Sequence, residues 1–263
     1  MKVDGKAIAA AILSSVKEEV DQLSKTPTMT AVTCAPNFET KKYLEMKKRR
    51  AASVGIILNV VELPEDATTE EALACVLKVS EQSDGVVVQL PLPAHMDKEA
   101  VLTGVPHGKD PDGFLYGNES NACLPPVVGA IDEISKEYTI DWSDAQVVIL
   151  GEGRLVGKPA AVYAGQQAKA VTVLTAENFD PEIVKTADIL ITGIGQPKFV
   201  SIDMVKEGVV VFDAGTSEDG GVLVGDVDPA VMEVGSLITP VPGGIGPITI
   251  AYLLKNLVML ARQ

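Results

Sequence analysis

The sequence predicts an α/β protein with two domains. Stretches with helical periodicity alternate with short runs rich in β-branched residues along nearly the whole chain, which is typical of parallel sheets covered by helices. A strand expected over 146–150 runs directly into a glycine-rich turn and a helix, the order found in doubly wound nucleotide-binding domains. At 263 residues the chain is long enough for two modest domains, each with its own core.

The first half of the chain carries the pattern of βαβ units. We expect helices over 4–23, 40–54 and 69–82, and strands over 28–34, 57–63 and 85–90. Asp4 and Thr69 stand at the starts of two of these helices, where a polar side chain satisfies free backbone N–H groups. The last strand is an unbroken β-branched run, which indicates a strand buried on both faces.

The second half repeats the alternation after a long loop. Residues 106–126 lack periodicity and are rich in Gly, Pro, Asn and Asp, and loops of this length in compact domains usually have a function. A helix over 127–138 follows. We then expect strands over 146–150, 170–174, 189–192 and 209–213, helices from 156 and near 202–206, and an apolar closing helix over 249–261.

Charge and composition exclude several classes of protein. The net charge of −14 argues against a nucleic-acid surface, because binding the phosphate backbone requires clustered Lys and Arg. The one basic run, over 41–50, is expected to be a solvated helix face. Three scattered cysteines and two histidines are too few for a disulfide framework or a metal cluster. We therefore expect a cytoplasmic protein with no metal.

No membrane segment is expected. The apolar stretch over 7–16 follows Asp4 and continues into charged residues, so it indicates a capped helix and not a signal peptide. No other run reaches the roughly 18 apolar residues that a spanning helix needs.

A glycine turn follows the strand expected over 146–150, and alone it is a signal of moderate strength. Gly151, Gly153 and Gly157 have the spacing G-x-G-x-x-x-G, and glycines at such a turn let backbone amides approach a pyrophosphate at a helix N-terminus. The alternative is a tight strand-to-helix turn that binds nothing, because such motifs are often matched by chance.

Two carboxylates stand where the adenosine ribose of a dinucleotide should fall. Glu152 lies inside the turn, and Glu177 lies just after the next strand. A carboxylate there accepts hydrogen bonds from a ribose 2′-hydroxyl and repels a 2′-phosphate, which favours NAD. Alternatively both point to solvent and Arg154 or Lys158 serves a phosphate.

Further polar side chains stand on one helix face, at the end of an expected strand and in a loop. Tyr43 and Lys47 are four residues apart and therefore share a face of their helix. Gln89 lies near the end of the buried strand expected over 85–90, and Asp110 and Asp112 lie in the loop expected over 106–126. Polar residues at the carboxyl ends of parallel strands line the ligand crevice of α/β folds. Each of them alone is also explained as a surface pair or a turn-former.

Taken together, five segments resemble the bifunctional methylenetetrahydrofolate dehydrogenase/cyclohydrolase family. They are YLEMK at 43–47, DGVVVQLPLP at 84–93, KDPDGF at 109–114, VGKP at 156–159 and TPVPGGIGP at 239–247. The segments at 84–93 and 239–247 are highly specific in combination, and the resemblance spans nearly the whole chain.

The resemblance implies a folate-binding catalytic domain and a Rossmann-like NAD(P)-binding domain. The first would comprise 1–126 and 239–263, completed by the C-terminal helix, and the second 127–238. It also implies a homodimer that handles tetrahydrofolate one-carbon derivatives in support of purine biosynthesis. The expected reactions are oxidation of 5,10-methylenetetrahydrofolate to the 5,10-methenyl form and hydrolysis of the latter to 10-formyltetrahydrofolate.

The resemblance also implies roles for particular residues. Lys47 would transfer protons in the cyclohydrolase reaction, with Gln89 as its hydrogen-bonding partner. Asp112 would anchor the pterin ring and Tyr43 would stack on the folate. The turn at Pro242, Gly243 and Gly244 would let backbone approach the bound substrate, and one of its X-Pro bonds is a candidate for a cis peptide. The cofactor site is expected at Gly151, Glu152, Gly153, Arg154, Gly157, Glu177 and Thr216.

The nucleotide turn departs from the family pattern. The family commonly has Gly-Arg-Ser where this chain has Gly151-Glu152-Gly153, and Ala176 replaces a serine that often contacts a phosphate. Gly215-Thr216-Ser217 stands where Gly-Ile-Asn is usual. NADP is the default of the family, but these changes favour NAD.

Two other functions remain open from the sequence. One is a monofunctional NAD-dependent methylenetetrahydrofolate dehydrogenase, which has no obvious need for Lys47. The other is a folate- or nucleotide-binding protein without catalysis, supported only by the altered glycine turn.

Overall fold

The computed structural model describes residues 1–262, which form two compact units. One comprises residues 10–125 together with the chain from Ile250 onward, and we call it the three-stranded unit. The other comprises Met1–Ala9 and Pro126–Thr249, and we call it the five-stranded unit. These boundaries place residues 1–9 and 239–249 with the five-stranded sheet, whereas the sequence-based division assigned them to the folate-binding domain. That division by function stays a prediction.

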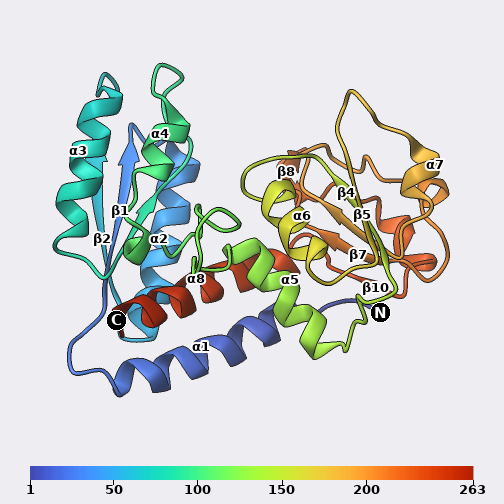
Figure 1. The fold of residues 1–263 in the computed structure, drawn as a ribbon, viewed down its shortest axis with the longest axis horizontal. Helices are drawn as coiled ribbons and strands as arrows, with labels where there is room; N and C mark the ends of the chain where they lie inside the picture. Colours follow the sequence, from blue (N-terminus) through green and yellow to red (C-terminus); the bar gives the residue numbers. More distant parts are fainter. Residues whose placement is uncertain (263) are drawn as a thin grey trace. The chain divides into compact units, whose positions relative to one another are not determined.

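The three-stranded unit is built on a parallel sheet in the order β2-β1-β3 (Figure 1). Its strands are β1 (Thr28–Cys34), β2 (Ile57–Leu63) and β3 (Gly85–Val88), and its helices include α2 (Phe38–Ser53), α3 (Thr69–Ser80) and α4 (Lys98–Thr103). The central strand β1 and the strand β3 are buried along almost their whole length, because both faces of a parallel sheet are covered. The expected βαβ arrangement is confirmed.

The five-stranded unit holds a parallel sheet in the order β10-β7-β6-β4-β5 (Figure 1). The strands are β4 (Gln146–Leu150), β5 (Ala170–Leu174), β6 (Ile189–Thr192), β7 (Val210–Asp213) and β10 (Leu237–Ile238). The chain runs from β4 outward to β5 and then returns to the other side of β4 at β6. The strand order therefore reverses between β4 and β6, and this switch point is where open α/β sheets bind ligands.

Shorter elements complete the five-stranded unit. They are α5 (Pro126–Glu137), α6 (Gly157–Gly165), α7 (Pro181–Val184), a hairpin of β8 (Ser217–Asp219) and β9 (Val222–Val224), and the 3₁₀ turns η2 (Ile202–Met204) and η3 (Pro229–Glu233). The helix expected near 202–206 is thus a single 3₁₀ turn. In the other unit, the loop after α4 contains the 3₁₀ turn η1 (His107–Lys109).

Capping side chains determine where the helices begin. Asp4 Oδ1 accepts hydrogen bonds from the N–H groups of Lys6 and Ala7 at the start of α1 (Gly5–Asp21), as expected. The capping residue of α3 is Thr68, one residue before the expected Thr69, because Thr68 and Glu71 form a reciprocal capping box. The last helix, α8 (Ile245–Ala261), begins four residues earlier than expected, since proline is tolerated in a first helical turn and Pro247 does not block it.

The loop over 110–125 is held by a side chain of α8. The Nδ2 atom of Asn256 donates to the carbonyl oxygens of Pro111 at 2.9 Å and Leu124 at 2.8 Å. Asn256 is buried, so these hydrogen bonds satisfy two carbonyl groups that water reaches poorly. The loop is therefore closed at its two ends by one residue of the last helix.

Replacing Asn256 by Ala should lower the free energy of unfolding by about 2 kcal/mol, because a buried acceptor left without its donor costs about 1–3 kcal/mol. Urea unfolding followed by circular dichroism measures the change. The control is Met259→Ala, which removes a half-exposed side chain from the same helix. Equal effects of the two variants would show that Asn256 does not hold the loop.

Candidate active site

Lys47 is the buried member of the basic run. Its side chain is 8% exposed, whereas Lys48, Arg49 and Arg50 on the same helix are exposed. The Nζ atom lies 4.9 Å from the centre of the Tyr43 ring, one helical turn earlier, which is within the range of a cation–π contact. The expectation of a solvated helix face therefore holds for most of the run but is wrong for Lys47.

Gln89 fixes the position of the Lys47 amine. Lys47 Nζ donates to Gln89 Oε1 at 3.0 Å, and Gln89 Nε2 donates to the carbonyl oxygen of Leu90 at 2.8 Å. The second hydrogen bond assigns the two ends of the amide, so its oxygen faces the lysine. Gln89 follows the end of the buried strand β3, and the next peptide bond, Leu90–Pro91, is cis.

Burial and a neighbouring carboxylate act in opposite directions on Lys47. Removal from water lowers the pKa of the Lys47 ammonium below its usual value, and the negative charge of Asp112 partly opposes this change. The same two effects act on Asp112, whose pKa is raised by burial and lowered by Lys47. A lysine in these surroundings exchanges a proton with a bound molecule more readily than one in water.

A second carboxyl group, that of Asp110, lies in the same loop as Asp112. It is 2% exposed, and burial together with repulsion from Asp112 raises its pKa to about 7, against hydrogen bonds from backbone N–H groups over 113–115. The nearby Cys123 thiol has its pKa raised to about 12, first by burial and then by Asp110 and Asp112. Cys123 is therefore a neutral thiol, and the Asp110 carboxyl keeps its proton to a higher pH than an ordinary aspartate.

The glycine turn of the five-stranded unit leads from β4 into α6. Gly151 has φ +86°, and a Cβ at Gly157 would lie 2.0 Å from the Gly151 carbonyl oxygen, so both positions require glycine. Gly153 differs, because a Cβ there would meet no atom within 4 Å. The turn is therefore tightly packed at Gly151 and Gly157 but has free space at Gly153. This free space suits the approach of a pyrophosphate to the start of α6.

The two predicted ribose-binding carboxylates follow adjacent strands. Glu152 comes after β4 and Glu177 after β5, and both are exposed. Thr175 Oγ1 donates to Glu177 Oε2 at 3.5 Å, and Asn178 Oδ1 accepts from the Thr175 N–H at 2.6 Å. Arg154 is half-buried.

The remaining predicted residues also lie in the five-stranded unit. Thr216 is exposed after β7. In the segment 240–244, the Val241–Pro242 bond is cis, as anticipated for this turn, and the Gly244 N–H donates to the Pro240 carbonyl oxygen at 2.7 Å. The structure thus places Tyr43, Lys47, Gln89 and Asp112 in one unit, and the glycine turn, Glu177, Thr216 and residues 242–244 in the other.

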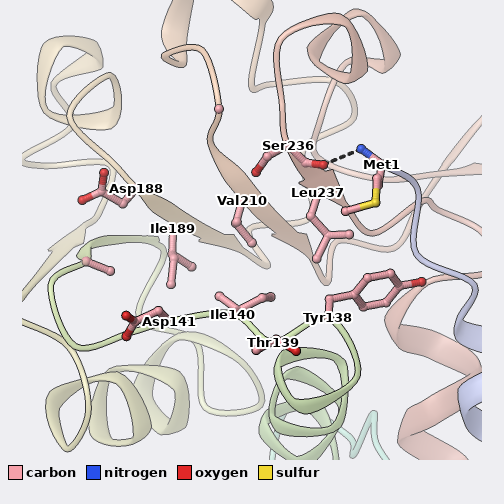
Figure 2. Close-up of a pocket in the computed structure, with 12 residues that line it drawn as sticks. Met1, Tyr138, Thr139, Ile140, Asp141, Asp188, Ile189, Val210, Ser236 and Leu237 are labelled. Atoms are coloured by element: carbon pink, nitrogen blue, oxygen red, sulfur yellow. Dashed lines mark hydrogen bonds between the residues drawn. The ribbon is translucent and has the colours of Figure 1, made fainter.

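A pocket of about 330 Å³ lies at the opposite, amino edge of the five-stranded sheet. Figure 2 shows Asp188, Ile189, Val210 and Leu237 lining it at the starts of the strands, with the Met1 amine hydrogen-bonded to the Ser236 carbonyl oxygen. None of the predicted site residues lines this pocket.

Residues 1–262 offer neither a cluster of metal ligands nor a membrane-spanning helix. No group of three or more His, Cys, Asp or Glu side chains in this range is placed to hold a metal ion. No helix in the same range is long and apolar enough to cross a membrane.

Two parallel-sheet units, one with a glycine turn at its switch point, define a protein of Rossmann-like architecture. The model described as the catalytic domain of tetrahydrofolate dehydrogenase/cyclohydrolase matches residues 3–112. The model described as the NAD(P)-binding domain of the same enzymes matches residues 125–263. The chain therefore belongs to the tetrahydrofolate dehydrogenase/cyclohydrolase family.

Individual relatives match over the full length. The bifunctional protein FolD of Lacticaseibacillus casei is 36% identical, with 100% of this chain and 98% of the relative covered. The solved structure of the bifunctional FolD enzyme from Campylobacter jejuni has a TM-score of 0.95 and 33% identity, covering 100% of this chain and 98% of its own. The Trypanosoma brucei FolD structure, complexed with NADP cofactor and inhibitor, has a TM-score of 0.91 and 31% identity, covering 100% and 97%. The predicted family, fold class and enzyme class are confirmed.

Substitutions at two glycines should separate folding from dinucleotide binding. Gly157→Ala places a Cβ against the Gly151 carbonyl oxygen and should lower both stability and affinity. Gly153→Ala meets no neighbour, so it should leave the melting temperature unchanged while weakening NAD(H) binding about tenfold, because its methyl group stands where the pyrophosphate approaches. Thermal unfolding and fluorescence titration with NADH and NADPH measure the two effects. Unchanged binding by Gly153→Ala would remove the turn from the cofactor site.

Proposed function

We propose that the chain performs both reactions of its family, with Lys47 as the proton-transferring group of the second. It oxidises 5,10-methylenetetrahydrofolate to 5,10-methenyltetrahydrofolate with NAD(P)⁺ and hydrolyses the product to 10-formyltetrahydrofolate. The observation that carries this assignment is the buried Lys47 amine held by Gln89 beside Asp112. A buried lysine with a lowered pKa among polar partners is a functional group in many enzymes.

The dehydrogenase reaction asks mainly for orientation. Bound NAD(P)⁺ supplies the acceptor for a hydride that leaves the methylene carbon of the folate. The contribution of the protein is to hold the reacting carbon in line with that acceptor. In this proposal the glycine turn and Glu177 hold the dinucleotide, while Tyr43 stacks on the folate and Asp112 binds its pterin ring. Residues 242–244 bring backbone groups to the bound substrate.

The cyclohydrolase reaction requires a base that accepts a proton from water and then an acid that protonates N5. The oxygen of a water molecule bonds to the cationic methenyl carbon, and the neutral amine of Lys47 accepts the proton that the water loses. The bond from this carbon to N5 then breaks as the Lys47 ammonium returns the proton to N5. The new hydroxyl group releases its own proton to water and becomes the carbonyl of the formyl group on N10. Gln89 Oε1 holds Nζ in place through both steps. Because burial lowers the pKa of Lys47, the neutral amine forms at a lower pH than it would for a lysine in water.

We infer that NAD is the preferred dinucleotide. The Trypanosoma brucei relative was solved with NADP, but this chain places the exposed carboxylates Glu152 and Glu177 after β4 and β5. Carboxylates at these strand ends bind a ribose 2′-hydroxyl and repel a 2′-phosphate. Arg154 and Lys158 are the cations nearest in sequence that would serve a phosphate instead.

We also infer a cytoplasmic homodimer that supplies formyl groups to purine biosynthesis. In this proposal the hairpin of β8 and β9, which exposes the apolar side chains of Val222 and Leu223, takes part in association. Light scattering of the purified protein tests the oligomeric state. The three free cysteines, Cys34, Cys75 and Cys123, suit a reducing compartment.

Lys47→Ala should abolish hydrolysis of methenyl-tetrahydrofolate, by at least a hundredfold in rate, while some hydride transfer remains, because only hydrolysis needs the amine. The loss of methenyl absorbance, with and without dinucleotide, measures hydrolysis. Lys48→Ala, an exposed neighbour on α2, is the matched control and should behave like the unaltered protein. Normal hydrolysis by Lys47→Ala would overturn the assignment.

The pH profile gives a second test of the same assignment. Hydrolysis should rise with pH through the lowered pKa of Lys47, since the neutral amine is the base. Asp112→Asn removes the negative charge that raises the pKa of Lys47, so the rising limb should move to lower pH even though weaker folate binding lowers the rate. If the rising part of the pH profile stays in place or moves to higher pH, Asp112 does not raise the pKa of Lys47 as proposed.

With methylene-tetrahydrofolate as substrate, NAD should give a KM about tenfold below that of NADP, because Glu152 and Glu177 repel the 2′-phosphate. Glu177→Gln should narrow the difference by removing one charge. Reduced dinucleotide and the methenyl product are followed together by absorbance. A preference for NADP would mean that Arg154 or Lys158 binds the phosphate, and no turnover with either dinucleotide would indicate a folate-binding protein without catalysis.

A further inference from the structure

Two buried aspartates stand at the carboxyl edge of the five-stranded sheet, and neither belongs to the site residues described above. Asp213 is the last residue of β7 and Asp226 follows β9. They are 3% and 0% exposed. Burying a carboxylate is costly unless hydrogen bonds replace those it made to water. Each of these side chains must therefore accept hydrogen bonds from groups of the protein.

Asp226 holds the loop that follows β6. Its Oδ2 accepts from Thr192 Oγ1 at 2.9 Å and from the Ile194 N–H at 2.8 Å. Its Oδ1 accepts from the Gln196 N–H at 2.9 Å. Both oxygens are thus used on one short segment, residues 192–196, and a carboxylate is the side chain that offers acceptors on both of its ends.

Asp213 ties Asp226 to the end of the neighbouring strand. Its Oδ1 accepts from the N–H groups of Gly215 at 2.9 Å and Asp226 at 3.2 Å, and its Oδ2 accepts from the Val227 N–H at 3.0 Å. A Cβ at Gly215 would meet the Asp226 carboxylate, and one at Gly225 would meet that of Asp213. The two carboxylates and two glycines therefore pack as one unit that joins the segments after β6, β7 and β9.

The segment that Asp226 holds lies against the glycine turn. A Cβ at Gly193 would meet the Val156 side chain at 2.7 Å, and one at Gly151 would meet the Ile194 side chain at 2.9 Å. β4 and β6 flank the switch point of the sheet, so the loops that follow them are the two walls of the expected dinucleotide crevice. Gly195, with φ +69°, is exposed and has no atom within 4 Å of a Cβ position.

We propose that Asp226, oriented by Asp213, is a positioning residue for the dinucleotide. It touches no reacting atom, and it sets the path of residues 193–196 so that their backbone meets the bound cofactor. This inference rests on the proposed use of NAD(P) by the five-stranded unit. In this proposal the charge of Asp226 fixes the conformation of a binding loop, because charge-assisted hydrogen bonds to several backbone N–H groups hold a loop more tightly than neutral ones.

Asp226→Asn tests the proposal, because an amide keeps the size of the side chain but loses acceptor capacity at one end. The dissociation constants of NADH and NADPH, measured by fluorescence titration, should rise about tenfold. The KM for dinucleotide should rise with little change in the KM for folate. Hydrolysis of methenyl-tetrahydrofolate without dinucleotide should stay within twofold, because its groups belong to the three-stranded unit.

The matched control is Asp188→Asn. Asp188 stands at the other end of β6 and accepts from the Gln146 N–H at 2.7 Å and from Lys206 Nζ at 2.6 Å. It should cost stability without changing dinucleotide affinity. If Asp226→Asn does not fold, Thr192→Val removes one of the three donors to Asp226 and should weaken dinucleotide binding about threefold.

The outcomes separate this inference from the proposed function. If the unaltered protein binds dinucleotide and both Asp226→Asn and Thr192→Val bind it equally well, the positioning role is overturned and the proposed function stands. If affinity falls as much in Asp188→Asn as in Asp226→Asn, the effect is general destabilisation and the inference is again overturned. If the unaltered protein binds neither NADH nor NADPH, the proposed cofactor use fails and the inference fails with it.

Discussion

The burial of one amine, that of Lys47, is the constraint around which the three-stranded unit is arranged. A lysine out of water must be held by polar partners, and here Gln89, the Tyr43 ring and the charge of Asp112 fill that need. These partners come from a helix, the end of a buried strand and a loop closed by α8. Together these elements keep the amine buried and hydrogen-bonded.

Both units place polar side chains at the carboxyl ends of buried parallel strands. Gln89 follows β3, the glycine turn follows β4, and Asp213 ends β7. The interior of each sheet is apolar and rigid, so the strand ends become fixed positions from which loops begin. In the proposed function the two units would use this arrangement differently. Lys47 and Gln89 would offer side chains to a substrate, whereas Asp213 and Asp226 hold backbone that would meet a dinucleotide.

The sequence predicted the strands closely, and the family resemblance predicted the hydrogen bond between Lys47 and Gln89, but other polar contacts were not predicted. β1, β2, β4, β5 and β6 have the expected bounds, and most of these β-rich runs are bordered by Gly, Pro or Asp. The two-residue β10 and the short α7 carry too few residues for a periodic signal. The partnership of Asp213 with Asp226 could not be predicted either, since it depends on how β7 and β9 meet in space. For Lys47, the sequence predicted a shared face with Tyr43, but charge alone indicated exposure.

The chain passes three times between the two units, and this has a consequence for its synthesis. Residues 10–125 form most of the three-stranded unit, yet Asn256, which closes the loop bearing Asp110 and Asp112, is made only after the whole five-stranded unit. On the ribosome the chain emerges from its N-terminus. The five-stranded unit, which ends at Thr249, has all its strands before α8 is complete, so the lysine site matures only when the last helix has left the exit tunnel.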